Sequence, residues 1–375
     1  MKTGIITIQD GENYGNRLQN YAMQESLRSL NILVDTIQYT IPNVSLCTRI
    51  VKTLKSIIKK IIRRKGLFDK RFESFHRFNS AYIKFSKNRI GINSVPPSIL
   101  EEYDMFVVGS DQVWNTNFHE ISDNIFYYLA VFAEPGKRIA YAASFGTQTI
   151  SEEYMKIFQK ELPLFKAVSV REKSGVAIAE SCGSTAEVVV DPTLLLSRSD
   201  WEKIAKKPVM FSEQDYIVTY FLGEVDIRIN QHIKNAAKGR RIVHLYNKYV
   251  REDRISSSWE YCMAPDEFVW LIEHASCVFT DSFHGSIFSI LFHRPFQVFD
   301  RHIDGKDCGM GTRIDTLLGT FHLESCRGDI INPSGFPQEQ EWKSVDEILS
   351  RERKKSLMFI INALDLNRQN QENDE

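Results

Sequence analysis

Short apolar runs alternate with helical patterns along most of the chain. In the first half, six runs are typical of buried strands, and most of them end in small or polar residues. They lie at residues 4–8, 34–39, 105–108, 138–143, 167–170 and 188–190. A helical pattern at about residues 18–30 separates the first two runs. This order of strand, helix and strand predicts a doubly wound α/β domain.

The second half of the chain repeats this alternation. We expect strands at residues 216–222, 241–245, 277–280 and 295–299, and helices at residues 227–237, from residue 264 onward, and at residues 282–291. Loop-like residues around 193–215 separate the two series. The pattern therefore predicts two Rossmann-like domains that face each other across a cleft, with ligands beyond the carboxyl ends of the strands.

We place an N-terminal domain at residues 1–195, on the acceptor side of the reaction considered below, and a C-terminal domain at residues 196–335, on the donor side. Residues 336–375 hold a helix at about 345–364, which can belong to either domain, and a polar tail.

Composition excludes several classes of protein. The chain has 47 Lys and Arg residues against 48 Asp and Glu residues, so its net charge of -1 does not favour a nucleic-acid partner. Its six cysteines form no CxxC pair and no zinc-ligand spacing, so we expect no metal and reduced thiols. No run reaches about 18 apolar residues, and the apolar run at the N-terminus is too short for a signal peptide. We expect a cytoplasmic protein.

Residues 49–71 differ from the rest of the chain. Ten basic residues and one acidic residue give this segment a net charge of +9, and apolar residues recur on one face at helical spacing. Two interpretations stay open. The segment can be a solvated helix that packs on the first domain, or an interfacial helix that binds anionic lipid headgroups at the inner face of the membrane.

Four strand ends carry candidate chemistry, at residues 13–19, 109–115, 169–172 and 280–285. A glycine-containing loop ahead of a helix exposes N–H groups that can bind an anion or a sugar oxygen. Trp114 can stack on a sugar, and Arg171 can bind a carboxylate or phosphate. Each feature also has a structural interpretation: a capped helix start, a tryptophan in the core, and an arginine paired with an acid such as Glu172.

His284 lies at the predicted N-terminus of a helix, where the helix dipole disfavours an imidazolium ion. A phosphate bound there would reverse that penalty. Lone histidines are usually structural, but three other polar strand ends on two facing domains favour a functional role.

Taken in order, the strand-end motifs resemble the polysaccharide pyruvyltransferase family over about residues 4–320. The motifs are Asn13–Gln19, Val107–Asn115, Ser169–Glu172, Val190–Thr193 and Thr280–Gly285, followed by Phe288-Ser289 and Pro295-Phe296. The resemblance implies a two-domain fold of the GT-B type. It also implies transfer of a pyruvyl group from phosphoenolpyruvate to two hydroxyls of a hexose, as a cyclic ketal, in the biosynthesis of a surface polysaccharide such as a capsule or exopolysaccharide.

The resemblance and the residue chemistry together suggest roles for individual residues. His284 and Asp111 are the catalytic candidates, because His284 can exchange protons near neutral pH. For phosphoenolpyruvate the candidates are Arg171, Arg313, Ser282 and Gly285; Arg313 belongs to a looser pattern. For the sugar acceptor they are Asn13, Tyr14, Gly15, Asn16, Gln19, Ser110, Gln112, Trp114 and Asn115. We expect no cofactor, and as partners phosphoenolpyruvate and a hexose-containing glycan on a polyprenyl carrier.

Two other functions fit the same pattern. A nucleotide-sugar glycosyltransferase would use the same cleft and helix N-terminus, and a non-catalytic protein could bind a sugar or a phosphate there. The sequence does not indicate which hexose, or which pair of hydroxyls, accepts the pyruvyl group.

Overall fold

The computed structural model describes residues 1–9, 11–40, 66–91, 94–303, 306–307, 311–328 and 339–366. Its first half forms a parallel sheet with the order β3-β2-β1-β4-β5-β6-β7. The strands are β1 (Lys2–Ile6), β2 (Leu33–Tyr39), β3 (Phe85–Ile90), β4 (Met105–Val108), β5 (Arg138–Ala143), β6 (Ala167–Val170) and β7 (Glu187–Val188). This order is that of a doubly wound domain.

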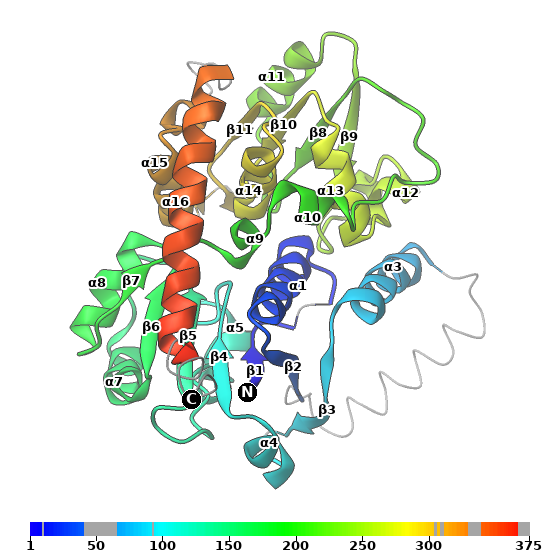
Figure 1. The fold of residues 1–375 in the computed structure, drawn as a ribbon. Coiled ribbons are helices and arrows are strands. Elements are labelled where there is room, and N and C mark those ends of the chain that lie inside the picture. Colours follow the sequence, from blue (N-terminus) through cyan, green and yellow to red (C-terminus); the bar gives the residue numbers. More distant parts are fainter. Residues whose placement is uncertain are drawn as a thin grey trace.

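The second half forms a smaller parallel sheet with the order β11-β10-β8-β9. Its strands are β8 (Tyr216–Tyr220), β9 (Arg241–Leu245), β10 (Cys277–Thr280) and β11 (Phe296–Val298), and a short antiparallel pair, β12 (His302–Ile303) and β13 (Lys306–Asp307), follows them. Figure 1 shows the two sheets one above the other. The two sheets confirm the prediction of two Rossmann-like α/β domains of the GT-B type.

Helices surround both sheets. In the first half they are α1 (Tyr14–Ser29), α3 (Leu67–Tyr82), α4 (Pro97–Glu102), α5 (His119–Ser122), α6 (Ile125–Tyr128), α7 (Glu152–Glu161), η1 (Leu162–Leu164), α8 (Lys173–Ser181), α9 (Pro192–Leu195) and α10 (Arg198–Glu202). In the second half they are α11 (Ile227–Ala237), η2 (Glu252–Arg254), α12 (Ser258–Tyr261), α13 (Pro265–Glu273), α14 (Phe283–Leu291), α15 (Gly311–Phe321), η3 (Glu324–Cys326) and α16 (Glu339–Ala363).

Most of the predicted elements occur within two or three residues of their expected bounds. The helix expected from residue 18 starts at Tyr14, because the Asn13 side chain caps it by accepting a hydrogen bond from the Asn16 N–H at 3.1 Å. The sequence pattern did not predict β3. This strand forms an edge of the sheet, and its three middle residues are exposed and polar, so it lacks the apolar run of a buried strand.

The C-terminal helix α16 contacts both domains. Its Arg353 donates hydrogen bonds to the backbone carbonyls of Leu194 and Leu196, beside the first domain. Nearer its N-terminus, Asp346 pairs with His293, which lies two residues after the second-domain helix α14. Figure 1 shows α16 running alongside both sheets. The helix therefore braces the two domains from one side.

The basic segment 49–71 lies outside the described residues as far as residue 65. The end of it, from Leu67, forms the start of α3. Arg71 is fully buried, and its guanidinium donates to the backbone carbonyls of Tyr261 at 2.5 Å and Glu12 at 3.0 Å. Counting Arg71 among the charges that could reach a lipid surface is therefore wrong. None of the helices in the described ranges is long and apolar enough to cross a membrane.

Candidate active site

The first turns of α1 and α14 meet between the two domains. Ser282 caps α14, and its side chain accepts a hydrogen bond from the Gly285 N–H at 3.3 Å. The next residue, His284, is largely buried and lies against Gly15 of α1. A Cβ atom on Gly15 would stand 2.1 Å from Nδ1 of His284, so only glycine allows this approach.

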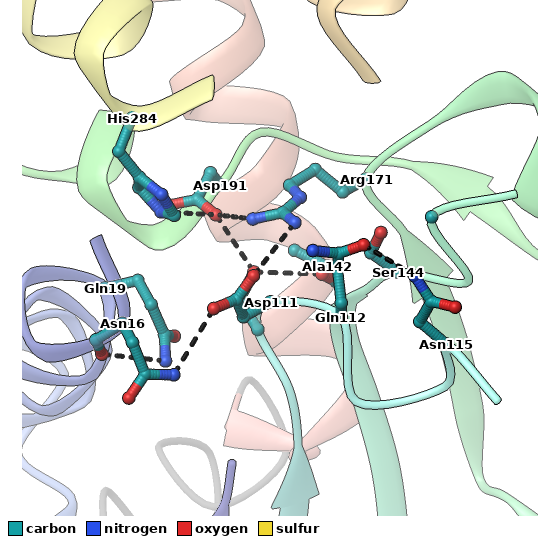
Figure 2. Close-up of polar contacts among 12 residues, drawn as sticks. Asn16, Gln19, Asp111, Gln112, Asn115, Ala142, Ser144, Arg171, Asp191 and His284 are labelled. Carbon is teal, nitrogen blue, oxygen red and sulfur yellow. Dashed lines mark hydrogen bonds and ion pairs between the residues drawn. The ribbon is translucent and has the colours of Figure 1, made fainter. Parts of the chain in front are cut away.

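Asp191 is the centre of a buried polar network beside His284. Its carboxylate accepts hydrogen bonds from Arg171 at 2.7 Å and from the Thr193 N–H at 3.0 Å. The Ser110 hydroxyl lies 3.0 Å from the same carboxylate, and Nε2 of His284 lies 3.8 Å from it. Figure 2 shows Asp191 next to Arg171 of the first domain and to His284 of α14. Asp191 thus fixes Arg171 and faces the imidazole.

Asp111 is the second carboxylate of this network. One of its oxygens lies 3.3 Å from the Arg171 guanidinium, and the other accepts a hydrogen bond from the Asn16 side chain at 3.3 Å. Arg171 therefore bridges Asp111 and Asp191, as Figure 2 shows.

Burial and neighbouring charges shift the pKa values of His284, Asp111 and Arg313. Burial lowers the pKa of His284, and the carboxylates of Asp191 and Asp111 offset this only in part, so the imidazole is neutral at pH 7. Burial alone would raise the pKa of Asp111, but the positive charge of Arg171, above all, outweighs it and lowers that pKa to about 2. Burial, together with Arg171 and Arg301, lowers the pKa of Arg313 to about 9.

A pocket of about 460 Å³ opens at this point. Both domains line it. The first contributes Ile8, Glu12, Asn13, Asn16, Asp111, Gln112 and residues 117–121, and the second contributes Tyr220, Leu222, residues 247–249, residues 282–284, Arg301 and Arg313. The size is ordinary for a small-molecule site. The pocket contains a neutral imidazole, an ionised carboxylate and guanidinium groups, which is a set suited to proton transfer on an anionic substrate.

The structure places seven of the residues predicted from sequence at this pocket: His284, Asp111, Arg313, Ser282, Asn13, Asn16 and Gln112. Gly15 contributes by its close approach to His284. Ser110 and Asn115 are buried. Ser110 bonds to Asp191 of the network beside His284, and Asn115 bonds to Gln112 of the pocket lining.

Three acceptor residues predicted from sequence were wrong. Trp114 is fully buried, donates its Nε1–H to the Tyr128 carbonyl at 3.1 Å and packs in the first-domain core. Tyr14 is buried between the domains, where its hydroxyl donates to the Met263 carbonyl. Gln19 is buried and donates to the Thr7 hydroxyl at 2.8 Å. The side-chain donor atoms of all three residues are bonded inside the protein, so they do not reach a bound sugar.

Two residues assigned to phosphoenolpyruvate also need correction. Gly285 packs on Thr280, where an added Cβ would lie 2.6 Å from the threonine hydroxyl, and its N–H is bonded to Ser282. It is absent from the lining of the pocket. Arg171 is absent from that lining too, because Asp111 and Asp191 hold it.

Sequence reasoning missed Asp191 and Arg301 as site residues. Asp191 was part of a quoted motif, and its position at a strand end before Pro192 and Thr193 was a signal for a buried cap. Arg301 had no such signal, because it lies on the loop that follows β11 and reaches the pocket only through the tertiary fold.

Comparison with protein families gives one match. A family model described as polysaccharide pyruvyl transferase matches residues 13–302. This span holds Asp111, Arg171, Asp191 and His284, and it ends before Arg313. A search of curated proteins gives no match.

Comparison with solved structures gives distant likenesses. The UDP-N-acetylglucosamine 2-epimerase from Rickettsia bellii is 8% identical, with 98% of this chain and 97% of that chain covered and a TM-score of 0.47. The UDP-GlcNAc 2-epimerase from Methanocaldococcus jannaschii, in complex with UDP-GlcNAc and UDP, is 12% identical, with 94% and 100% covered and a TM-score of 0.44. T4 phage BGT with UDP-glucose is 13% identical, with 97% and 100% covered and a TM-score of 0.36. Such scores support no inference about the ligand of this chain.

Proposed function

The chain belongs to the polysaccharide pyruvyl transferase family, and from this premise we propose that it transfers a pyruvyl group from phosphoenolpyruvate to two hydroxyls of one hexose in a surface-polysaccharide repeat unit. The products are a cyclic pyruvate ketal and phosphate. One observation carries the proposal: neutral His284, ionised Asp111 and the guanidinium of Arg313 line the same pocket.

The donor brings negative charge to this pocket and needs a proton on C3. Its phosphate and carboxylate raise the pKa of His284 when they bind, which favours the imidazolium form. The imidazolium protonates C3, and C2 becomes electrophilic. A sugar hydroxyl then attacks C2, the C2–O bond to phosphate breaks, and the second hydroxyl closes the ketal. C3 keeps the proton that it received from His284. The two sugar hydroxyls release two protons: one returns His284 to the imidazolium form, and the other leaves with the phosphate.

Asp111 acts on the acceptor side of this reaction. With a pKa of about 2 it stays ionised, so it accepts a hydrogen bond from a sugar hydroxyl and orients it toward C2. Asn16, which donates to the same carboxylate, holds it in place. The positive charge of Arg313 stabilises the departing phosphate.

The mouth of the pocket fits a carbohydrate. Tyr249 is 79% exposed and lines the pocket from the second domain, and Phe118 and His119 line it from the first. Asn247 holds the Tyr249 loop, because its side chain donates to the Leu222 carbonyl at 3.2 Å and accepts from the Tyr249 N–H at 2.7 Å. We assign the acceptor, a hexose-containing glycan on a polyprenyl carrier, to this mouth.

The test is a reaction of the purified chain with phosphoenolpyruvate and hexose-containing glycans. Phosphate release together with the mass gain of one pyruvate ketal on the glycan supports the proposal. Nucleotide release from a nucleotide sugar would instead indicate a glycosyltransferase, and ligands unchanged after long incubation would indicate a binding protein. His284→Gln should lower kcat by a factor of about 10²–10⁴. His293→Gln, which alters a surface pair with Asp346, should leave kcat unchanged.

A further inference from the structure

Two carboxylates already occupy the terminal nitrogens of Arg171, and its Nε is buried without a hydrogen-bond partner. Its side chain is 1% exposed, and its two terminal nitrogens face Asp191 at 2.7 Å and Asp111 at 3.3 Å. The guanidinium also covers the ring of Phe283 at 4.3 Å. Arg171 lines a small cavity of about 30 Å³ beside α9 and α15, which has room for about one water molecule. Two carboxylates therefore already balance its charge.

Arg301 and Arg313 differ from Arg171, because both line the 460 Å³ pocket. Asp281 holds Arg301 in place: the guanidinium donates to the Asp281 backbone carbonyl at 3.3 Å, and its Nε lies 3.5 Å from the Asp281 carboxylate. That carboxylate is itself fixed by the N–H groups of Leu222 and Gly223, each at 2.7 Å. Arg301 is thus placed rigidly at the pocket wall.

Arg313 is a buried cation without a carboxylate partner. It is 4% exposed, its Nε is buried without a hydrogen bond, and no ion pair joins it to an acid in the described ranges. Repulsion from Arg301 and Arg171 adds to the cost of its burial. A buried guanidinium in such a position is costly unless an anion compensates it. The N-terminus of α14, capped by Ser282 in the same pocket, favours an anion too.

We propose that Arg301 and Arg313 together bind the phosphate group of the donor, and that Arg171 is a positioning residue that does not touch it. This inference rests on the proposed function for the identity of the donor. Two guanidiniums suit a dianion, because each fork binds two phosphate oxygens. Arg171 then acts through others: it holds Asp111 for the acceptor and Asp191 beside His284.

The test measures binding of inorganic phosphate and of phosphoenolpyruvate to the full chain by titration calorimetry. Arg301→Lys and Arg313→Lys should each weaken both ligands by about 10-fold or more, because a lysine cannot reproduce the fork. Arg171→Lys should weaken inorganic phosphate by less than about 3-fold, while it lowers kcat and shifts the pH profile of turnover. Arg228→Lys, an exposed pair with Asp226, is the control and should change nothing.

The inference is overturned if Arg301→Lys binds inorganic phosphate as wild type does, or if Arg171→Lys loses as much phosphate affinity as Arg301→Lys. Melting curves of each variant identify loss of fold; if Arg301→Lys fails to fold, Arg301→Gln and Arg313→Gln decide by the same binding measurement. Phosphate binding that depends on Arg301 in a chain that does not turn over phosphoenolpyruvate would support the anion site and reject the proposed function. The two failures are therefore distinguishable.

Discussion

The imidazole of His284 rests on the backbone of Gly15, so close that a Cβ atom added there would lie 2.1 Å from Nδ1. The contact joins the first turn of α1 in the first domain to the first turn of α14 in the second. The position of the candidate acid/base group therefore depends on the absence of a side chain in the opposite domain.

Gly15→Ala should abolish most of the turnover, because the methyl group must push His284 away from its position. We expect a loss approaching that of removing the histidine, about 10²–10⁴ in kcat. The matched control is Gly11→Ala, in the same loop region, where an added Cβ meets nothing within 4 Å. Phosphate release by both variants checks this, with melting curves to verify folding. Wild-type rates in Gly15→Ala would mean that His284 does not act from the position described.

The strand ends could be read from the sequence because their chemistry is local. An apolar run followed by polar residues places those residues at the carboxyl edge of a parallel sheet. Two domains were expected to face each other across a cleft, so Asp111 and Arg171 of the first domain and His284 of the second were expected near one another, and they are. The direction in which each side chain points at these strand ends could not be predicted from the sequence. It depends on the loop backbone: Gly109 has a φ of +116°, and Asp111 has a φ of +73°. These angles direct Asp111 to the pocket, while Trp114 enters the core.

Contacts between residues that are distant in the chain could not be predicted from the sequence either. Arg71 sits in a basic run and reads as a solvent-facing charge, yet the rings of Tyr14, Phe75 and Tyr261 surround it. Phe75 lies on the same helix as Arg71, but Tyr14 and Tyr261 come from distant parts of the chain, so no local pattern predicts this burial. Arg301 escaped prediction for the same reason.

Binding of phosphoenolpyruvate should take up protons through His284. Burial holds the pKa of the free histidine below 6.5, and a bound anion raises it. Between these two pKa values the complex binds a proton that the free protein lacks. The affinity for phosphoenolpyruvate therefore falls as pH rises from the lower pKa to the higher one. Asp111, with a pKa of about 2, does not titrate in this range. Calorimetry in two buffers of different ionisation enthalpy measures the uptake.

The phosphate of the donor titrates near the same pH, so the informative quantity is the difference between wild type and His284→Gln. We expect greater proton uptake in wild type. Equal uptake in both proteins would exclude His284 as the group that gains the proton.

Asp191→Asn should mainly lower the free energy of unfolding, whereas Asp111→Asn should mainly lower kcat. The Asp191 side chain is fully buried and bonded to Arg171, so Asp191→Asn leaves a buried guanidinium short of one counter-charge. Breaking such a pair costs about 3–5 kcal/mol of unfolding free energy. The Asp111 side chain is 13% exposed and faces the pocket, so Asp111→Asn should destabilise less while kcat falls. Urea unfolding and phosphate release compare the two. A larger loss of stability in Asp111→Asn would reverse the assignment.

The basic segment 49–65 bears on where the protein works. The chain is near neutral overall, yet this segment carries basic residues interleaved with apolar ones at helical spacing. Each Lys or Arg near an anionic surface contributes about 1 kcal/mol, so binding to anionic vesicles should be measurable at low salt and weaken at high salt. Such binding would bring the active site to a lipid-linked acceptor.

Co-sedimentation with anionic vesicles tests this role, and the choice of variant matters. Arg71 must stay intact, because it is buried against Tyr14 and Tyr261 and its loss would disturb the fold. The variant therefore changes Lys59, Lys60, Arg63 and Arg64 to Gln, and the matched control changes the exposed Lys203, Lys207, Lys238 and Lys354. We expect the first variant to lose vesicle binding and the second to keep it. Because turnover on a soluble acceptor needs only the pocket, the first variant should keep that activity. The membrane role is rejected if the wild-type protein never co-sediments with the vesicles at low salt. It is also rejected if both variants bind the vesicles equally.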